Sequence, residues 1–155
     1  MIRLHKRAST ALKVAALAHD VERALPTRKV HRRDFSDYDA FKRAHAANSA
    51  RIADELMVAF GLAPPFRARV RFLIENHEHG GYADNELRVL KDADALSFFH
   101  INLPLYAQRH QSDEVWFRIK WGYARLSEHA RKMVHSLAYD DDRLNEYLTR
   151  MRQTV

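Results

Sequence analysis

The chain has 155 residues, no cysteine, and 26 Lys and Arg against 20 Asp and Glu, which gives a net charge of +6. The absence of cysteine excludes disulfides and thiolate metal sites and fits a reducing cytoplasm, and no apolar run approaches the roughly 20 residues that cross a bilayer. Only four Gly and four Pro leave little room for the tight turns of an all-β fold, so we expect one cytoplasmic, mostly helical domain without a membrane anchor.

The hydrophobic periodicity predicts an all-α fold, a bundle of about six to eight helices with short connections. The expected helices cover about residues 8–24, 39–60, 64–79, 85–99, 113–124, 127–139 and 141–152. The first of them is apolar on most of its surface, which is typical of a buried helix. The aromatic side chains between residues 116 and 123 are expected in the core or on the face of a homodimer.

Several helix ends carry local signals. Ser36 or Asp37 is the expected N-cap of the second helix, because short polar side chains accept hydrogen bonds from the first turn. Gly61 is the expected C-cap of the same helix, and Ser127 has the N-cap position of the segment 127–139. A short loop that contains Pro104 is expected after the fourth helix.

A His and an Asp stand side by side near the end of the first helix, at His19 and Asp20. A buried imidazole and carboxylate are costly unless they are paired, and such groups hold divalent cations where no thiolate is present. Helices joined by short loops run antiparallel, so groups at their ends can meet. A hydrogen-bonded His–Asp pair without metal is the alternative. Further candidate donors lie near helix ends or breaks, at His45, His77, Asp92 and Asp94.

Glu22 lies three residues after His19, on the same helix face. It is a candidate general base or a group that orients water, and a surface ion pair with Arg23 is the alternative. Much of the positive charge stands in "RKVHRRDF", residues 28–35, which is either a solvated connection or a phosphate contact, since guanidinium groups match phosphate oxygens. The candidate phosphate-binding residues are Arg23, Arg28, Lys29, Arg32, Arg33 and Arg43.

Four segments together resemble the HD-domain superfamily of metal-dependent phosphohydrolases, closest to an uncharacterised bacterial branch. They are "AALAHDVER", "HAANSARIADEL", "VRFLIENHEHGG" and "LRVLKDADALSFF". The resemblance covers about residues 10–100. It implies a single HD-like helical domain over residues 1–155, with a core at about 10–100 and a helical extension at about 101–155.

The resemblance also implies roles for the candidate donors. His19, Asp20 and Asp94 correspond to metal ligands, and His45 and His77 to histidines that hold a second metal or a phosphate oxygen. Family members usually have a first His well over twenty residues before the HD pair. Here His5 stands only 14 residues before His19, roughly 20 Å away along a continuous helix, so we expect that ligand to be absent.

We therefore expect a metal-dependent phosphohydrolase that acts on a phosphomonoester or nucleotide through a metal-activated water, with Asp20 and Glu22 as catalytic residues. Mn²⁺, Mg²⁺, Fe²⁺ and Zn²⁺ all suit a His and Asp site. A phosphate-bearing small molecule is the expected partner, and a nucleic acid is less favoured. The alternative is a regulatory module that binds a metal, nucleotide or RNA without turnover, because the first ligand is missing.

Overall fold

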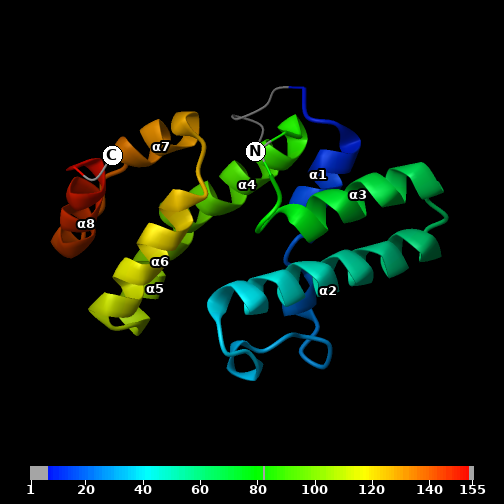
Figure 1. Cartoon of the computed structure of the whole chain (residues 1–155), viewed down its shortest axis with the longest axis horizontal. Helices are drawn as coiled ribbons and strands as arrows, with labels where there is room; N and C mark the ends of the chain where they lie inside the picture. Colours follow the sequence, from blue (N-terminus) through cyan, green and yellow to red (C-terminus); the bar gives the residue numbers. More distant parts are fainter. Residues whose placement is uncertain (1–6, 82, 154–155) are drawn as a thin grey trace. The chain divides into compact units, whose positions relative to one another are not determined.

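The structure is a computed structural model that describes residues 7–81 and 83–153. These residues form eight α-helices and no strand, which confirms the predicted all-α fold (Figure 1). By its internal contacts the chain divides into two compact units, residues 1–90 and residues 91–155, called the first and the second unit below. The division precedes the boundary near residue 100 that the resemblance predicts. Over the described residues, no helix combines the length and the apolar character that a membrane span needs.

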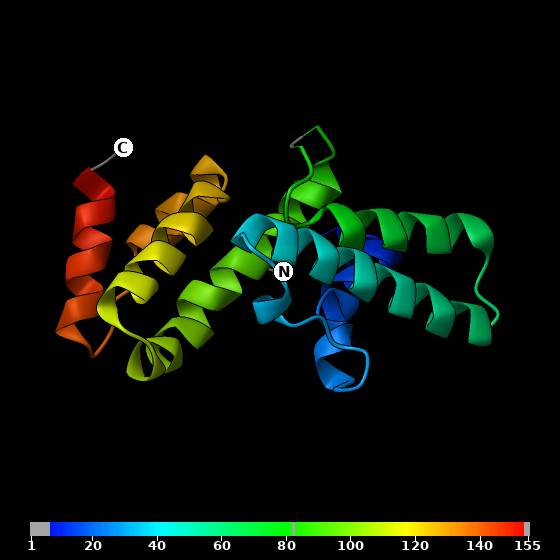
Figure 2. The same cartoon turned by 60° about the horizontal axis from the view of Figure 1, so that its bottom comes forward.

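The first unit is built on a helical hairpin. Its elements are α1 (Thr10–Ala18), η1 (Val21–Ala24), η2 (Arg32–Asp34), α2 (Tyr38–Ala59), α3 (Pro64–Asn76) and the start of α4 (Asn85–Ser97). Helices α2 and α3 lie side by side in both views (Figures 1 and 2). Alanines of α1 and α2 meet Leu73 and Ile74 of α3 in the core, and their small side chains allow the helices to approach closely.

Local signals set both ends of α2 as predicted. Asp37 is the N-cap, and its carboxylate accepts a hydrogen bond from the backbone N–H of Ala40 (2.7 Å). Gly61 follows the C-terminus with φ +69°, and the N–H of Leu62 donates to the carbonyl of Met57 (3.0 Å). Such a left-handed residue suits glycine. It reverses the chain toward α3.

The end of α1 differs from the prediction of one continuous helix over residues 8–24. The α-helix stops at Ala18, and Asp20 has φ −108° and ψ 14° before the 3-10 turn η1 begins. The break changes the direction of the chain, so Glu22 is buried with 1% of its surface exposed. The helix is also less enclosed than its composition indicates, because Leu17 is 87% exposed.

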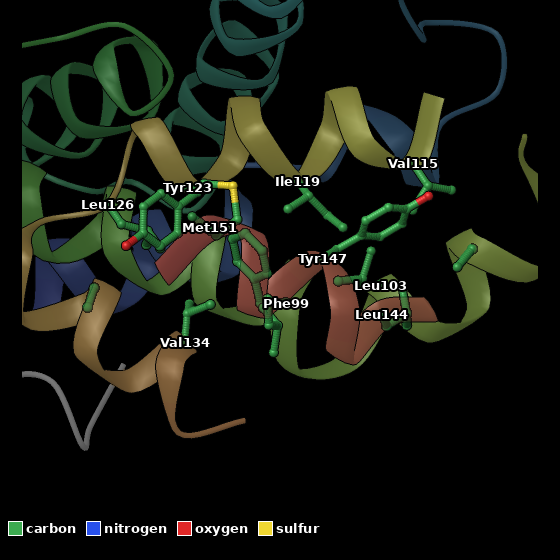
Figure 3. Close-up of a cluster of buried hydrophobic side chains, with 14 residues drawn as sticks. Phe99, Leu103, Val115, Ile119, Tyr123, Leu126, Val134, Leu144, Tyr147 and Met151 are labelled. Carbon is green, nitrogen blue, oxygen red and sulfur yellow. The ribbon is translucent and has the colours of Figure 1, made fainter. Parts of the chain in front are cut away.

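The second unit encloses a separate core of aromatic and aliphatic side chains (Figure 3). Its elements after α4 are η3 (Phe98–Asn102), α5 (Leu103–Arg109), α6 (Ser112–Ala124), α7 (Glu128–His135) and α8 (Asp142–Gln153). Phe99 and Ile119 are fully buried at its centre, and Gly122 passes the Phe99 ring so closely that a Cβ would lie 3.4 Å from it. Ser127 caps α7, as predicted.

The loop expected around Pro104 is absent from the structure. The chain instead passes from α4 through the π-helical turn η3 into α5, where Pro104 occupies the first turn. A proline there costs no hydrogen bond, because the first N–H groups of a helix have no partner within it. The carbonyl of Phe99 accepts a hydrogen bond from the Tyr139 hydroxyl (2.7 Å), which compensates for the altered helical pattern.

Candidate functional site

The break after α1 sets the positions of two acidic side chains. His19 is the last residue of the α1 turn, and its Nδ1 donates to the carbonyl of Ala16 (2.9 Å). Asp20 follows, half exposed, with Oδ2 accepting from Arg23 Nε (3.0 Å). Glu22 lies on η1 and turns into the interior. His19 and Asp20 therefore lie at the end of α1, and Glu22 on η1 adds a third side chain that is buried in the first unit.

His45 on α2 lies between the two carboxylates. Its Nδ1 is 2.6 Å from Glu22 Oε1 and its Nε2 is 2.7 Å from Asp20 Oδ1. Glu22 Oε2 accepts two further hydrogen bonds, from Asn48 Nδ2 (2.5 Å) and from the backbone N–H of Val30 (3.2 Å). These contacts fix both carboxylates and the imidazole, so the region from η1 to Val30 is fastened to α2.

His77, at the end of α3, brings a third imidazole. Its Nδ1 donates to the carbonyl of Ile74 (2.6 Å), and its ring centroid lies 5.1 Å from that of His19 and 6.5 Å from that of His45. Its Nε2 is 3.4 Å from Glu78 Oε1. Three imidazoles from three separate elements therefore converge. Together with Asp20, which His45 contacts, they place four of the predicted residues in one cluster.

The electrostatics of the cluster favour an ionised Asp20. Burial raises the pKa of this carboxyl, but the hydrogen bond from His45 and the charges of Arg23 and His19 outweigh burial and hold the pKa well below its usual value. An anionic oxygen is the form in which a carboxylate binds a cation. The site therefore has the ionised carboxylate of Asp20 beside the imidazoles of His19 and His45.

The two acidic candidates of α4 belong to the second unit and have contacts there. Asp92 accepts hydrogen bonds from the backbone N–H of Ser127 (2.8 Å) and from its hydroxyl (2.6 Å), one on each carboxylate oxygen. Asp92 is therefore occupied in fixing the start of α7. Asp94 Oδ2 accepts from Arg125 Nη2 (3.3 Å). Its role as a metal ligand stays a prediction, and His5 lies outside the described residues.

A comparison with known families gives one match. The model of a domain of unknown function, DUF4202, matches residues 1–146. The chain belongs to the DUF4202 family. Neither the curated proteins nor the solved structures contain a match to it.

The basic candidates of this DUF4202 chain are spread around the cluster with different contacts. Arg23 is paired with Asp20, and Arg28 Nη2 with Glu55 Oε2 (2.5 Å). Arg32 donates to the carbonyl of Phe35 (2.6 Å). The remaining three are exposed: Lys29, Arg33 and Arg43. The alternative for Glu22, a surface ion pair with Arg23, is wrong, because Glu22 is buried and Arg23 contacts Asp20.

Three buried or half-buried residues of the cluster are missing from the sequence-based set. Lys42 forms an ion pair with Glu78, both almost fully buried, and Asn48 donates to Glu22 and to the carbonyl of Arg28 (2.7 Å). One signal was present for Lys42, which stands three residues before His45 and so shares its helix face. Glu78 is adjacent to His77 in sequence. No feature of the neighbouring sequence indicates that Asn48 contacts Glu22.

Proposed function

We propose that this DUF4202 protein is a metal-dependent phosphohydrolase that cleaves a phosphomonoester or nucleotide, with its site in the first unit. The observation that carries the proposal is the convergence of the His19, His45 and His77 rings, from three elements, with the Asp20 carboxylate held by His45. Histidines gathered from distant parts of a chain beside an ionised carboxylate are typical of metal centres. The resemblance to the HD-domain superfamily supports the same activity.

The types of donor in the cluster suit a divalent cation. His19 and His77 each use Nδ1–H on a backbone carbonyl. In the neutral form of either ring the lone pair is therefore on Nε2, which is the usual arrangement of a metal-binding histidine. Two imidazoles on one ion, at metal–nitrogen distances of about 2.0–2.1 Å, have ring centres roughly 5 Å apart, and the observed separation is 5.1 Å. We propose His19, Asp20 and His77 as ligands from the first unit. Their donor atoms do not all lie within 4.8 Å of one another in the structure, so a bound ion would have to draw them closer.

The chain's other residues position this set. His45 has a carboxylate at each ring nitrogen, so we assign it the role of orienting Asp20. Glu22 in turn holds His45, and its three contacts fill the carboxylate, which makes it a positioning residue. A divalent cation, when bound, acidifies a coordinated water and draws charge from a phosphoryl group. Mn²⁺, Mg²⁺, Fe²⁺ and Zn²⁺ all accept nitrogen and oxygen donors.

The test combines metal analysis with a phosphatase assay. We expect the purified protein to bind Mn²⁺ and to release phosphate from a phosphomonoester, and His77→Ala and Asp20→Asn to abolish both. His129→Ala is the matched control, since His129 is exposed in the second unit. Asp94→Asn tests the remaining predicted ligand, which belongs to the second unit.

The other outcomes are equally informative. Metal or nucleotide binding without turnover would favour the alternative, a regulatory module that binds a metal, nucleotide or RNA. A protein that binds neither metal nor phosphate, with unchanged behaviour in His77→Ala, would contradict the proposal. We also propose a cytoplasmic location, because the chain contains no cysteine and secreted domains of this size commonly use disulfides.

A further inference from the structure

A basic segment of the first unit has no part in the assignments above. Residues 29–33, "KVHRR", contain three cations and no acidic residue, and we call them the basic segment. The side chains of Lys29, His31, Arg32 and Arg33 are all exposed. The proposed metal site uses none of them, so their concentration at this place needs another explanation.

The backbone of the basic segment is fixed to the residues of the cluster. The N–H of Val30 donates to Glu22 Oε2 (3.2 Å), and the other oxygen of Glu22 contacts His45 (2.6 Å). The carbonyl of Arg28, one residue before the segment, accepts from Asn48 Nδ2 (2.7 Å). A fixed backbone presents the flanking side chains in one arrangement, which lowers the entropy that a bound ligand has to remove.

The cations of the basic segment differ from the arginines of the α2–α3 hairpin in their partners. The hairpin arginines that each contact an Asp or Glu are Arg51, Arg67, Arg69 and Arg71. Among the described residues, the Lys29 ammonium has no ion pair and Arg32 contacts no carboxylate. Arg33 Nε lies 3.8 Å from Asp34 Oδ1, and both side chains are exposed, so this contact contributes little. The segment therefore presents positive charge that an anion can neutralise.

Aromatic rings follow the basic segment directly. Phe35, Tyr38 and Phe41 are half-buried, and the ring centroid of Phe41 lies 6.1 Å from that of Phe35 and 6.0 Å from that of Tyr38. The guanidinium of Arg32 lies 6.0 Å from the Tyr38 ring, and Phe41 stacks on His45 at 6.2 Å. Cations and rings are therefore neighbours beside the cluster. Single-stranded nucleic acids bind such surfaces, with phosphates on the cations and bases on the rings.

Other anionic partners fit this surface less well. A membrane surface requires exposed apolar side chains next to the cations, but no large hydrophobic side chain is exposed within residues 18–55, all of which the structure describes. His31 has an extended backbone (φ −105°, ψ 135°), and the four steps from Lys29 to Arg33 span at most roughly 13 Å. A row of cations along such a stretch suits successive phosphates of a strand.

We infer that the basic segment and the rings after it bind a single-stranded nucleic acid, with Lys29, Arg32 and Arg33 on its phosphates. The inference goes beyond the proposed function, since binding at this surface requires neither a metal nor hydrolysis. RNA and DNA share this chemistry, and the experiment distinguishes them. A strand on the segment lies next to the proposed site, because Val30 is bonded to Glu22.

The experiment measures the fluorescence anisotropy of labelled oligouridylate and oligodeoxythymidylate of about 12 nucleotides, with the full chain, in EDTA and at several salt concentrations. Unlabelled tripolyphosphate serves as a competitor. The segment variant combines Lys29→Gln, Arg32→Gln and Arg33→Gln. The control variant removes the same charge from three exposed cations of the same unit and combines Arg7→Gln, Lys13→Gln and Arg88→Gln. Tyr38→Leu tests the stacking.

We expect wild type to bind an oligonucleotide with an affinity that falls as salt rises. The slope of log K against log salt should be smaller by about 2 in the segment variant, because each phosphate contact on a single strand contributes about 0.7 to it. The control variant should keep most of the wild-type slope and affinity. Tyr38→Leu should weaken binding about fivefold or more through the lost stacking, and circular dichroism should show every variant folded.

Four results would overturn the inference. Two concern the charge: wild type that binds no oligonucleotide, and equal losses in the segment and control variants, which would attribute binding to net charge alone. Two concern the strand: wild-type affinity in Tyr38→Leu, and tripolyphosphate that binds as tightly as the oligonucleotide.

The proposed function fails separately. Oligonucleotide binding that depends on the basic segment, in a protein without metal binding or hydrolysis, would retain the inference and reject the hydrolase. Metal-dependent hydrolysis in a protein that binds no oligonucleotide would do the reverse.

Discussion

Glu22→Gln tests whether the buried carboxylate of η1 holds the cluster together. Glu22 is 1% exposed, and its two oxygens face three donors, from His45, Asn48 and Val30. Glutamine has nearly the same shape but only one acceptor oxygen, so its NH₂ group faces either His45 or the other two donors. The substitution therefore removes the negative charge from all three contacts and forces a rearrangement of at least one.

The magnitude follows from the kind of hydrogen bond that is lost. A hydrogen bond to a charged group contributes about 1.5–3 kcal/mol and a neutral one about 0.5–1.5 kcal/mol, so three weakened contacts should cost about 2–4 kcal/mol of the free energy of unfolding, allowing for partial rearrangement. The cost should fall on the first unit. It should appear together with weaker binding at the cluster, because Glu22 orients His45.

The assay uses the positions of the tryptophans. Trp116 and Trp121 are both in the second unit, so their fluorescence in a urea titration reports that unit, while far-ultraviolet circular dichroism reports all helices. Glu22→Gln should lower the midpoint seen by circular dichroism. Glu55→Gln, which changes a half-exposed carboxylate paired with Arg28 and Arg51, should leave both curves in place. Equal curves for the two variants would refute the reasoning.

Three other substitutions and conditions give expected results. Acidification should destabilise wild type more than Asp20→Asn, because the pKa of Asp20 is lowered in the folded protein. The contribution of ionised Asp20 to the free energy of unfolding is complete above the ordinary carboxyl pKa of about 3.9 and is lost as the pH falls below it. Urea titrations at several pH values measure this loss. Gly61→Ala should lower the free energy of unfolding by about 1 kcal/mol, because the φ of +69° strains alanine although its Cβ meets no atom within 4 Å. Gly61→Asn should lose less stability in a thermal melt, because asparagine tolerates this conformation better. Phe99→Ala should cost about 3–5 kcal/mol through the cavity at the centre of the second core, seen as an earlier fluorescence transition; a loss under about 1 kcal/mol would contradict the described packing.

The regular helices were largely predictable, because their signals are local. The apolar period and the caps Asp37 and Gly61 located α2 almost to the residue. Apolar residue type was a poorer guide to burial on that helix, since Phe60 is 81% and Leu56 is 48% exposed. Periodicity shows that a helix has an apolar face, but the neighbouring elements decide how much of that face is covered.

The candidate site was predictable only in part. Residues His19, Asp20, His45 and His77 were selected by type and by position near helix ends, and the structure brings them together. Asp92 was a candidate by the same reasoning, but its carboxylate holds Ser127 of another helix. Nothing within the α4 sequence distinguishes a carboxylate that caps a distant helix from one that binds a cation.

The sequence by itself determined that the chain is helical, where most helices begin and end, and which side chains have the chemistry of a metal site, because these properties depend on residues a few positions apart. Only the tertiary structure decided that Glu22 is buried, that His45 lies between two carboxylates, and that Lys42 meets Glu78 beside His77. The physical reason is that these pairings depend on atoms brought from 23 to 36 residues away. A break of two residues after Ala18, which the hydrophobic pattern does not show, was enough to bury Glu22 at the centre of a polar network.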